Sequence, residues 1–267
     1  MTDGMGRRTF IASSLAVVGA SAIGASAQEA ASPPRRQVYV LQVYELANAG
    51  SVEKIDAYCQ NALIPALKRA KAGPVGVLIE TSKDAAPPTY YVLIPLESIE
   101  DAAALPRTLD ADSEYAKAGE AFLKAPPKEP VYTNLETRLM LSADFMPKLQ
   151  VPENKPTRLF ELRRYRSPSE PAFRKKLEMF GPAGEAGIFR RVGLNAVFFG
   201  EMLAGPDMPN ITYMLGYADE NAKKAGWKAF GSDPEWKKLS TTPGYTNAEI
   251  IANIKSIMLK PAPYSEI

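Results

Sequence analysis

The chain has 267 residues, of which 46% are hydrophobic and 23% are charged, the proportions of an ordinary globular protein rather than a disordered or fibrous one. Its 32 Lys and Arg against 30 Asp and Glu leave a formal charge of +2, too small a surplus to predict nucleic-acid or anionic-membrane binding. With no histidine and one cysteine, the chain lacks the residues for His-based triads, His-ligated zinc or haem, Cys-clustered metal sites and an internal disulfide. We therefore expect no metal and no cofactor.

Residues 1–27 have the pattern of an export signal. Arg7 and Arg8 precede the short apolar segment Leu15–Ala20, and Ala25-Ser26-Ala27 is a typical cleavage site. The paired arginines make the segment similar to a twin-arginine signal. The alternative, a membrane anchor, needs about 20 strongly apolar residues, and this stretch is shorter and rich in Ser, Ala and Gly. We expect a bacterial protein exported to the periplasm or the medium, with no stable membrane span after cleavage.

The remaining chain is predicted to contain two tandem copies of one domain. Shifting the sequence by 121 residues aligns Leu41 with Leu162 and Asp112 with Asp233, together with several other matches. A period this long indicates a duplicated domain rather than a solenoid. We expect a disordered, Pro-rich leader at 28–36, a diverged first domain at 37–145, a Pro-rich linker at 146–156 and a second domain at 157–263.

In chain order, each half is predicted to contain a strand, a helix, two strands, a helix and a strand. The first half has strands at Val38–Glu45, Val75–Glu80, Thr89–Leu96 and Tyr132–Leu141, a helix capped by Ser51 and kinked or ended at Pro65, and helices at Ser98–Leu105 and Asp112–Leu123. The second half has strands at Arg158–Arg166, Asn195–Met202, Ile211–Tyr217 and Ile250–Leu259, and helices from Ser169 to Gly181, then at Glu185–Val192, Glu220–Phe230 and Asp233–Leu239.

This order predicts an α+β fold of two tandem ferredoxin-like (βαββαβ) units. Helices cover one face of each sheet, so the other face must also be buried. A duplicated chain can achieve this by closing its two sheets against each other.

Four segments of the second half carry a specific resemblance: Phe160–Tyr165, Ala196–Glu201, Ile211–Leu215 and Asp233–Trp236. They resemble the NIPSNAP family, which belongs to the larger group of dimeric α/β barrels. The first half resembles a more diverged copy, with Asp112-Ser113-Glu114-Tyr115 in place of Asp-Pro-Glu-Trp. The resemblance implies an intrachain dimeric α/β barrel and no established reaction. Its wider group includes cofactor-free monooxygenases, isomerases and haem enzymes, of which the His-ligated haem branch is not open to this sequence.

The opening strands contain the candidate ligand-binding residues. Side chains alternate along a strand, so Glu161, Arg163 and Tyr165 share one face, matched in the first half by Gln42 and Tyr44. We expect this face to point into the barrel and the apolar face to pack on helices; the apolar face bears Tyr39, Leu41, Val43, Phe160 and Leu162. One interpretation is a structural Glu161–Arg163 ion pair. The other is a cleft where Arg163 holds an anionic group and Tyr165 donates a hydrogen bond.

Two tryptophans complete the candidate set. Trp227 could line a pocket mouth and Trp236 belongs to the same candidate pocket, although both have the spacing of core-facing helix residues. Cys59 lies on the apolar face of its helix and is predicted to be a buried, unreactive thiol.

Three functions remain open. The first is binding of a small molecule or a protein partner without catalysis. The second is a cofactor-free oxygenase or isomerase that uses Tyr165, Arg163 and one of the tryptophans. The third is a structural or assembly role, and a homo-oligomer is compatible with all three.

Overall fold

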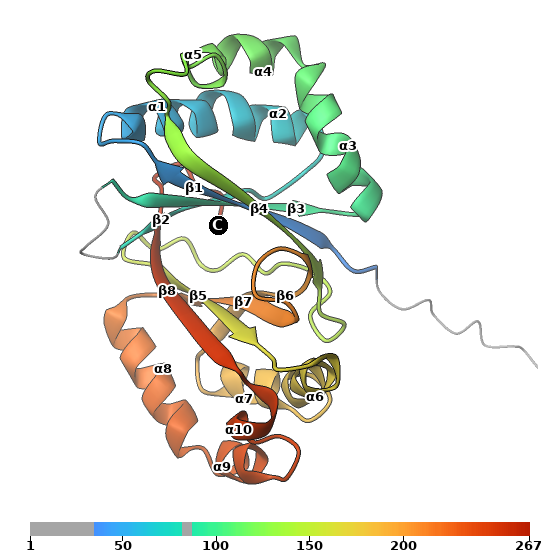
Figure 1. Ribbon diagram of the computed structural model, residues 1–267. Helices are drawn as coiled ribbons and strands as arrows, with labels where there is room; N and C mark the ends of the chain where they lie inside the picture. The colour runs from blue at the N-terminus through green and yellow to red at the C-terminus, as the bar shows by residue number, and fades with distance from the viewer. Residues whose placement is uncertain (1–34, 82–86) are drawn as a thin grey trace, which may run out of the picture. The chain divides into compact units, whose positions relative to one another are not determined.

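The computed structural model describes residues 35–81 and 87–267. The predicted signal at 1–27 and residues 28–34 of the predicted leader lie outside the described residues. Eight described strands close into one antiparallel barrel in the order β1-β3-β2-β8-β5-β7-β6-β4 (Figure 1). Their bounds are β1 Val38–Leu46, β2 Gly76–Glu80, β3 Thr89–Leu96, β4 Tyr132–Ser142, β5 Leu159–Arg166, β6 Asn195–Ala204, β7 Asn210–Tyr217 and β8 Asn253–Pro261.

The helices lie outside the barrel, with α1 to α5 on one side and α6 to α10 on the other (Figure 1). Their bounds are α1 Ser51–Tyr58, α2 Ile64–Arg69, α3 Ile99–Asp110, α4 Ser113–Ala118, α5 Glu120–Leu123, α6 Glu170–Phe180, α7 Glu185–Arg191, α8 Glu220–Ser232, α9 Pro234–Thr241 and α10 Asn247–Ile250. Within the described ranges, none of these helices has the length and hydrophobicity needed to cross a bilayer.

The two halves of the barrel repeat at the offset seen in the sequence. Strand β3 and strand β7 have the same length and start 121 residues apart, and β4 and β8 start at the same separation. Each half orders its strands in the ferredoxin-like way, as β4-β1-β3-β2 and β8-β5-β7-β6. The halves join through antiparallel pairing of β2 with β8 and of β4 with β6. The predicted α+β fold with an internal barrel is confirmed.

The predicted helix start at Asp233 is confirmed by its hydrogen bonds. The Asp233 carboxylate accepts from the backbone N–H of Glu235 and of Trp236, at 2.9 and 3.1 Å, and Pro234 is the first residue of α9. The predicted cap at Ser51 is wrong, because Ser51 already lies inside α1 and its side chain caps nothing. The predicted disturbance at Pro65 is confirmed as a π-helical segment, Cys59–Leu63, between α1 and α2.

The described residues begin inside the predicted leader, at residue 35. The guanidinium of Arg36 pairs with Glu201 and with Asp144, 3.0 Å away. The predicted linker, 146–156, contains neither helix nor strand. It is nevertheless fixed to the second half, since the backbone N–H of Gln150 donates to the carbonyl of Val197 at 2.8 Å.

The barrel interior is filled by apolar side chains from both halves. They form one buried cluster that includes Tyr39, Leu41, Val43, Leu93, Met140, Phe160, Leu162, Met214, Leu259 and Ile267. The predicted orientation of the opening strands is therefore wrong. The apolar face points into the barrel, and the face with Gln42, Tyr44, Glu161, Arg163 and Tyr165 points toward the helices. The apolar face belongs inside because a closed barrel offers few hydrogen-bond partners, whereas helix side chains supply them.

Candidate functional site

In the second half, the space between sheet and helices is occupied by a polar network around Glu161. This buried carboxylate accepts hydrogen bonds from Tyr217 at 2.8 Å, from Ser256 at 2.5 Å and from the indole N–H of Trp227 at 3.0 Å. It also pairs with Arg163. Burial acts to raise the pKa of Glu161, but the Ser256 hydrogen bond and the Arg163 charge outweigh it and hold the pKa below its usual value. Glu161 is therefore ionised at neutral pH.

Arg163 is held on every side by the protein itself. Its Nε donates to the Tyr213 hydroxyl at 2.9 Å, and one terminal nitrogen donates to the Tyr165 hydroxyl at 3.0 Å. Its guanidinium lies 4.7 Å from the centre of the Trp227 ring. The structural interpretation of the Glu161–Arg163 pair is favoured, because its donors already have protein acceptors.

A second buried ion pair lies beside this network. Lys176 on α6 and Glu185 on α7 meet at 2.6 Å, with side chains 1% and 2% exposed. The Lys176 ammonium also lies 5.2 Å from the centre of the Tyr165 ring. The sheet–helix space of the second half is thus closed by charged and aromatic groups that bind one another.

The remaining candidates lie outside this network. Trp236 on α9 packs against Phe230 with ring centres 4.3 Å apart, as expected for a core residue. Cys59 is fully buried, and burial raises the pKa of its thiol to about 12, so the predicted unreactive thiol is supported. Of the predicted set, the structure brings together Glu161, Arg163, Tyr165 and Trp227, and places Gln42 and Tyr44 in the other half.

The first half carries smaller groups at the equivalent positions. Arg163 on β5 lies opposite Ser256 on β8, and its counterpart Gln42 on β1 lies opposite Thr137 on β4. At the offset of 121, Val40 corresponds to Glu161, and Pro106 on α3 corresponds to Trp227 on α8. The ion pair and the indole that fill the second half are thus absent from these positions in the first.

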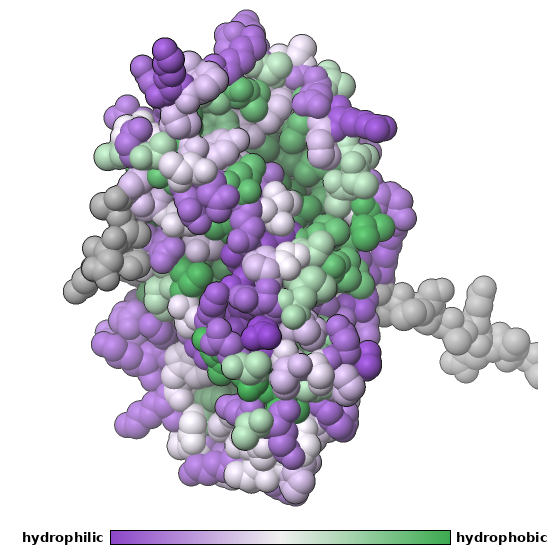
Figure 2. Space-filling view, viewed as in Figure 1, coloured by the Kyte–Doolittle hydropathy of each residue, from purple (hydrophilic) through white to green (hydrophobic). Residues whose placement is uncertain are grey.

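Two adjoining cavities occupy this space in the first half. One, of about 330 Å³, lies between β1, β4 and α3 and is lined by Val40, Gln42, Ile99, Ala102, Ala103, Leu105, Pro106, Thr137 and Leu139. The other, of about 200 Å³, reaches toward α1 and α4 and is lined by Gln42, Tyr58, Leu63, Ile94, Leu105, Pro106, Leu109, Asp110 and Tyr115. Both are bordered by Gln42, Leu105 and Pro106, and we call them together the α3 cleft. Figure 2 shows hydrophobic residues gathered on this face beside α3.

The polar groups at the α3 cleft include two separate hydrogen-bonded pairs. The Tyr44 hydroxyl donates to the Gln42 carbonyl oxygen at 3.0 Å, and the Tyr58 and Tyr115 hydroxyls lie 2.9 Å apart. Burial raises the pKa of Tyr58 and of Tyr115, so both phenols stay protonated near neutral pH. Within residues 35–81 and 87–267, the Gln42 amide nitrogen has no hydrogen-bond partner, so it can donate to a ligand. The cleft therefore offers the neutral amide of Gln42 as a donor, together with the Thr137 hydroxyl and the Asp110 carboxylate, among apolar lining residues.

Comparison with known proteins assigns the second half. Residues 160–266 match the NIPSNAP family. These residues are a NIPSNAP domain. A search of curated proteins finds no match.

Solved structures share the whole barrel. A protein described as a putative monooxygenase from Fusobacterium nucleatum superposes with a TM-score of 0.57 at 10% identity, covering 85% of this chain and 92% of its own. A second protein of that description, from Lactobacillus acidophilus, has a TM-score of 0.53 at 10% identity, covering 85% and 94%. An anthrone oxidase-like protein has a TM-score of 0.51 at 13% identity, covering 85% and 92%. At such identities these similarities establish the dimeric α/β-barrel fold alone.

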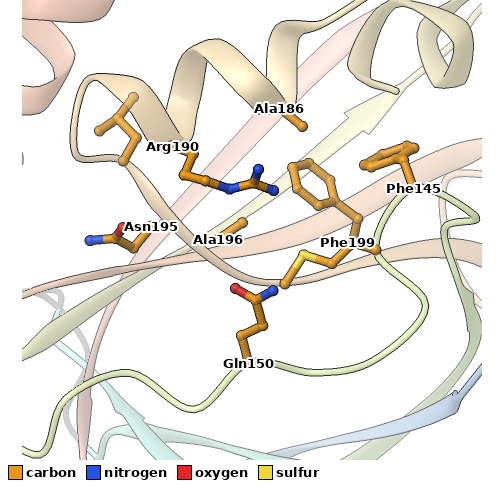
Figure 3. A pocket seen from close by; sticks show the side chains of 9 residues that line it. Phe145, Gln150, Ala186, Arg190, Asn195, Ala196 and Phe199 are labelled. Atoms are coloured by element: carbon orange, nitrogen blue, oxygen red, sulfur yellow. The ribbon is translucent and has the colours of Figure 1, made fainter. Parts of the chain in front are cut away.

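Other hollows border the NIPSNAP domain. Figure 3 shows Gln150 and Arg190 beside one of about 50 Å³ next to Phe199, which has room for a few water molecules. A wider surface hollow of about 610 Å³ is bordered by Arg36 and Glu201, which already pair with each other. No cluster of metal-ligating side chains occurs in the parts of the chain that the structure describes.

Sequence reasoning missed most of the groups that define the two sites. In the NIPSNAP domain these are Tyr213, Tyr217 and Ser256, which bind Arg163 or Glu161 from other strands. In the first half they are Pro106 and Thr137. The offset of 121 already aligned Pro106 with Trp227, and that loss of a large side chain was the available signal for the cleft.

Proposed function

We propose that this protein binds a small, mainly apolar molecule in the α3 cleft and does not transform it. The observation that carries the proposal is the replacement of Glu161, Arg163 and Trp227 by Val40, Gln42 and Pro106 at equivalent positions. The two cavities of about 330 and 200 Å³ occupy the space that the larger groups fill in the NIPSNAP domain. Their combined size suits an organic ligand, since ligand pockets span about 300–1,000 Å³.

The lining specifies the chemistry of the ligand. Ala102, Leu105 and Leu139 favour an aliphatic or aromatic body through burial of apolar surface. The amide nitrogen of Gln42 favours a hydrogen-bond acceptor, such as a carbonyl or ether oxygen, at the inner end. The phenols of Tyr58 and Tyr115 remain neutral, which supports binding rather than acid–base chemistry.

The proposal includes export. Residues 1–27 combine two arginines, a short apolar segment and an Ala-x-Ala site. A binding protein of this kind would meet its ligand in the periplasm or the medium. Sequencing the N-terminus of the protein recovered from those fractions tests this point, and an intact residue 1 there contradicts it.

The binding test places in the first half a side chain that the NIPSNAP domain has at the equivalent position. Pro106→Trp introduces the side chain that fills the equivalent space, and Ala104→Trp adds the same side chain at an exposed α3 position outside the cleft. Native mass spectrometry of the exported protein reports any retained molecule, and titration with the apolar dye Nile red reports the cleft directly. We expect Pro106→Trp to weaken dye binding about tenfold or more, as for loss of ~1.4 kcal/mol, and Ala104→Trp to leave it unchanged. Equal affinities in the two variants refute the proposal.

A second candidate is a cofactor-free oxygenase, favoured by the Tyr58–Tyr115 hydroxyl pair at the cleft and by the descriptions of the barrel's structural neighbours. Its test is oxygen consumption in the presence of the molecule retained by the exported protein. An oxygenase predicts turnover that falls in Tyr58→Phe while dye affinity stays the same. Absence of turnover with a bound molecule favours simple binding.

A further inference from the structure

One end of the barrel interior is polar, unlike the rest of it. Arg164 shares the inward face of β5 with Phe160 and Leu162, because side chains alternate along a strand. By the same alternation, Arg138 lies on the inward face of β4 with Met140. Two arginines therefore reach the interior from strands β5 and β4, which lie three places apart in the barrel order.

The two guanidiniums lie at the same end of the barrel. Arg164 pairs with Asp207, in the turn between β6 and β7, at 2.6 Å. Arg138 packs against Gly205 of the same turn, where an added Cβ would lie 3.5 Å from the Arg138 Cγ. Burial, followed by the charge of Arg138, lowers the pKa of Arg164, which agrees with this proximity.

Arg164 is not fully satisfied by the protein. Its Nη1 is buried and has no hydrogen-bond partner among the described residues. When a buried N–H of a charged group has no acceptor, the loss of folding free energy is larger than for an unpaired neutral N–H. A bound ion is one of the explanations for such a group in a native structure, together with an ordered water, strain or a catalytic role.

The sign of the electrostatic potential at this end of the barrel depends on how deeply each charged side chain is buried. The side chains of Arg138 and Arg164 are 9% and 11% exposed, whereas those of their partners Glu136 and Asp207 are 36% and 33% exposed. Water screens the outer carboxylates more strongly than the inner guanidiniums. Glu80, which accepts from the Tyr91 hydroxyl at 3.3 Å, and Lys255, 3.1 Å from Asp207, add one charge of each sign near this end. The positive potential at the buried level rests on the two guanidiniums, which lie deeper than Glu136 and Asp207.

We propose that this end of the barrel is a binding site for a small oxyanion, a carboxylate or a phosphate, held between Arg138 and Arg164. The planar guanidinium suits this role because its N–H groups match two oxygens of such an anion. The Arg164 Nη1 supplies the donor that the protein leaves open. The site is separate from the α3 cleft, which lies on the outer face of the sheet.

The test is isothermal titration calorimetry of the full protein with sodium phosphate and with sodium acetate, at ionic strength held constant with sodium chloride. We expect both anions to bind in the millimolar range or tighter, and the ratio of their affinities to tell which oxyanion the site prefers. Arg164→Gln and Arg138→Gln should each weaken binding about tenfold or more, because each removes charged hydrogen bonds. Arg164→Lys, which keeps the charge and loses the planar fork, should show a smaller loss.

Arg69→Gln is the matched control, since Arg69 pairs on the outside of the protein with Asp112 and Glu114. It should bind phosphate as the unmodified protein does, and so should Pro106→Trp, which separates this site from the α3 cleft. Absence of binding up to on the order of 10 mM anion, a range that covers affinities weaker than about −4 kcal/mol, overturns the proposal. Equal weakening in Arg69→Gln and Arg164→Gln overturns it as well.

Discussion

Removal of Glu161 tests whether the second half is held by mutual pairing of buried charges. Glu161→Val places in the NIPSNAP domain the residue found at the equivalent position, Val40. It removes the carboxylate that accepts from Tyr217, Ser256, Trp227 and Arg163. Breaking a buried ion pair by deleting one partner costs about 3–5 kcal/mol, because the other charge stays buried alone. We expect Glu161→Val to lower the free energy of unfolding by this amount.

The double variant Glu161→Val, Arg163→Gln reproduces the first-half pair Val40 and Gln42. It should be less destabilised than Glu161→Val alone, since no unpaired charge remains and the Tyr217 hydroxyl can still accept from Trp227 at 3.0 Å. We expect a coupling free energy of about 2–3 kcal/mol between the two positions. Urea unfolding followed by circular dichroism measures all four proteins, independently of the indole at the site. If the losses of unfolding free energy in the two single variants add up to the loss in the double variant within about 0.5 kcal/mol, the argument is refuted.

Two further predictions follow from groups in the second half. Lys176→Met leaves Glu185 buried without its cation; burial already raises the pKa of Glu185, so the folded state binds a proton more readily than the unfolded state. The variant should therefore gain stability as the pH falls from about 8 to 5, and thermal unfolding that shows the same pH dependence as the unmodified protein would contradict this. Asp233→Ala removes two cap hydrogen bonds and the ion pair with Arg191, so a loss of about 0.5–2 kcal/mol is expected in urea unfolding. Asp112→Ala, which removes the equivalent cap in the first half, should give a loss of similar size, and no measurable loss in either variant would contradict the capping argument.

The strands and their order could be predicted from the sequence because each strand contains its own signal. Alternation and β-branched or aromatic residues placed β3 at its observed bounds, Thr89–Leu96. The repeat at 121 residues then made the two halves support each other. Helix α10, Asn247–Ile250, was missed because four residues are too short to show a helical period.

The direction of the side chains could not be predicted in the same way. Alternation shows that Glu161 and Arg163 share a face, but both faces of a barrel strand are covered, so the pattern does not say which face is inside. That choice depends on partners distant in sequence, such as Trp227 on α8 and Ser256 on β8. The polar end of the barrel was missed for the same reason, since Arg138 and Arg164 come together only when the barrel closes.

Closure of the barrel within one chain bears on how its two halves can evolve. Because β2 pairs with β8 and β4 with β6, each half supplies both partner edges that the other requires. In a barrel assembled from two copies of one polypeptide, any residue that fills a space would fill it twice. The fused chain is free of that constraint, so one half can hold Trp227 and Arg163 as a rigid support. The other half, with Pro106 and Gln42, is left free to specialise.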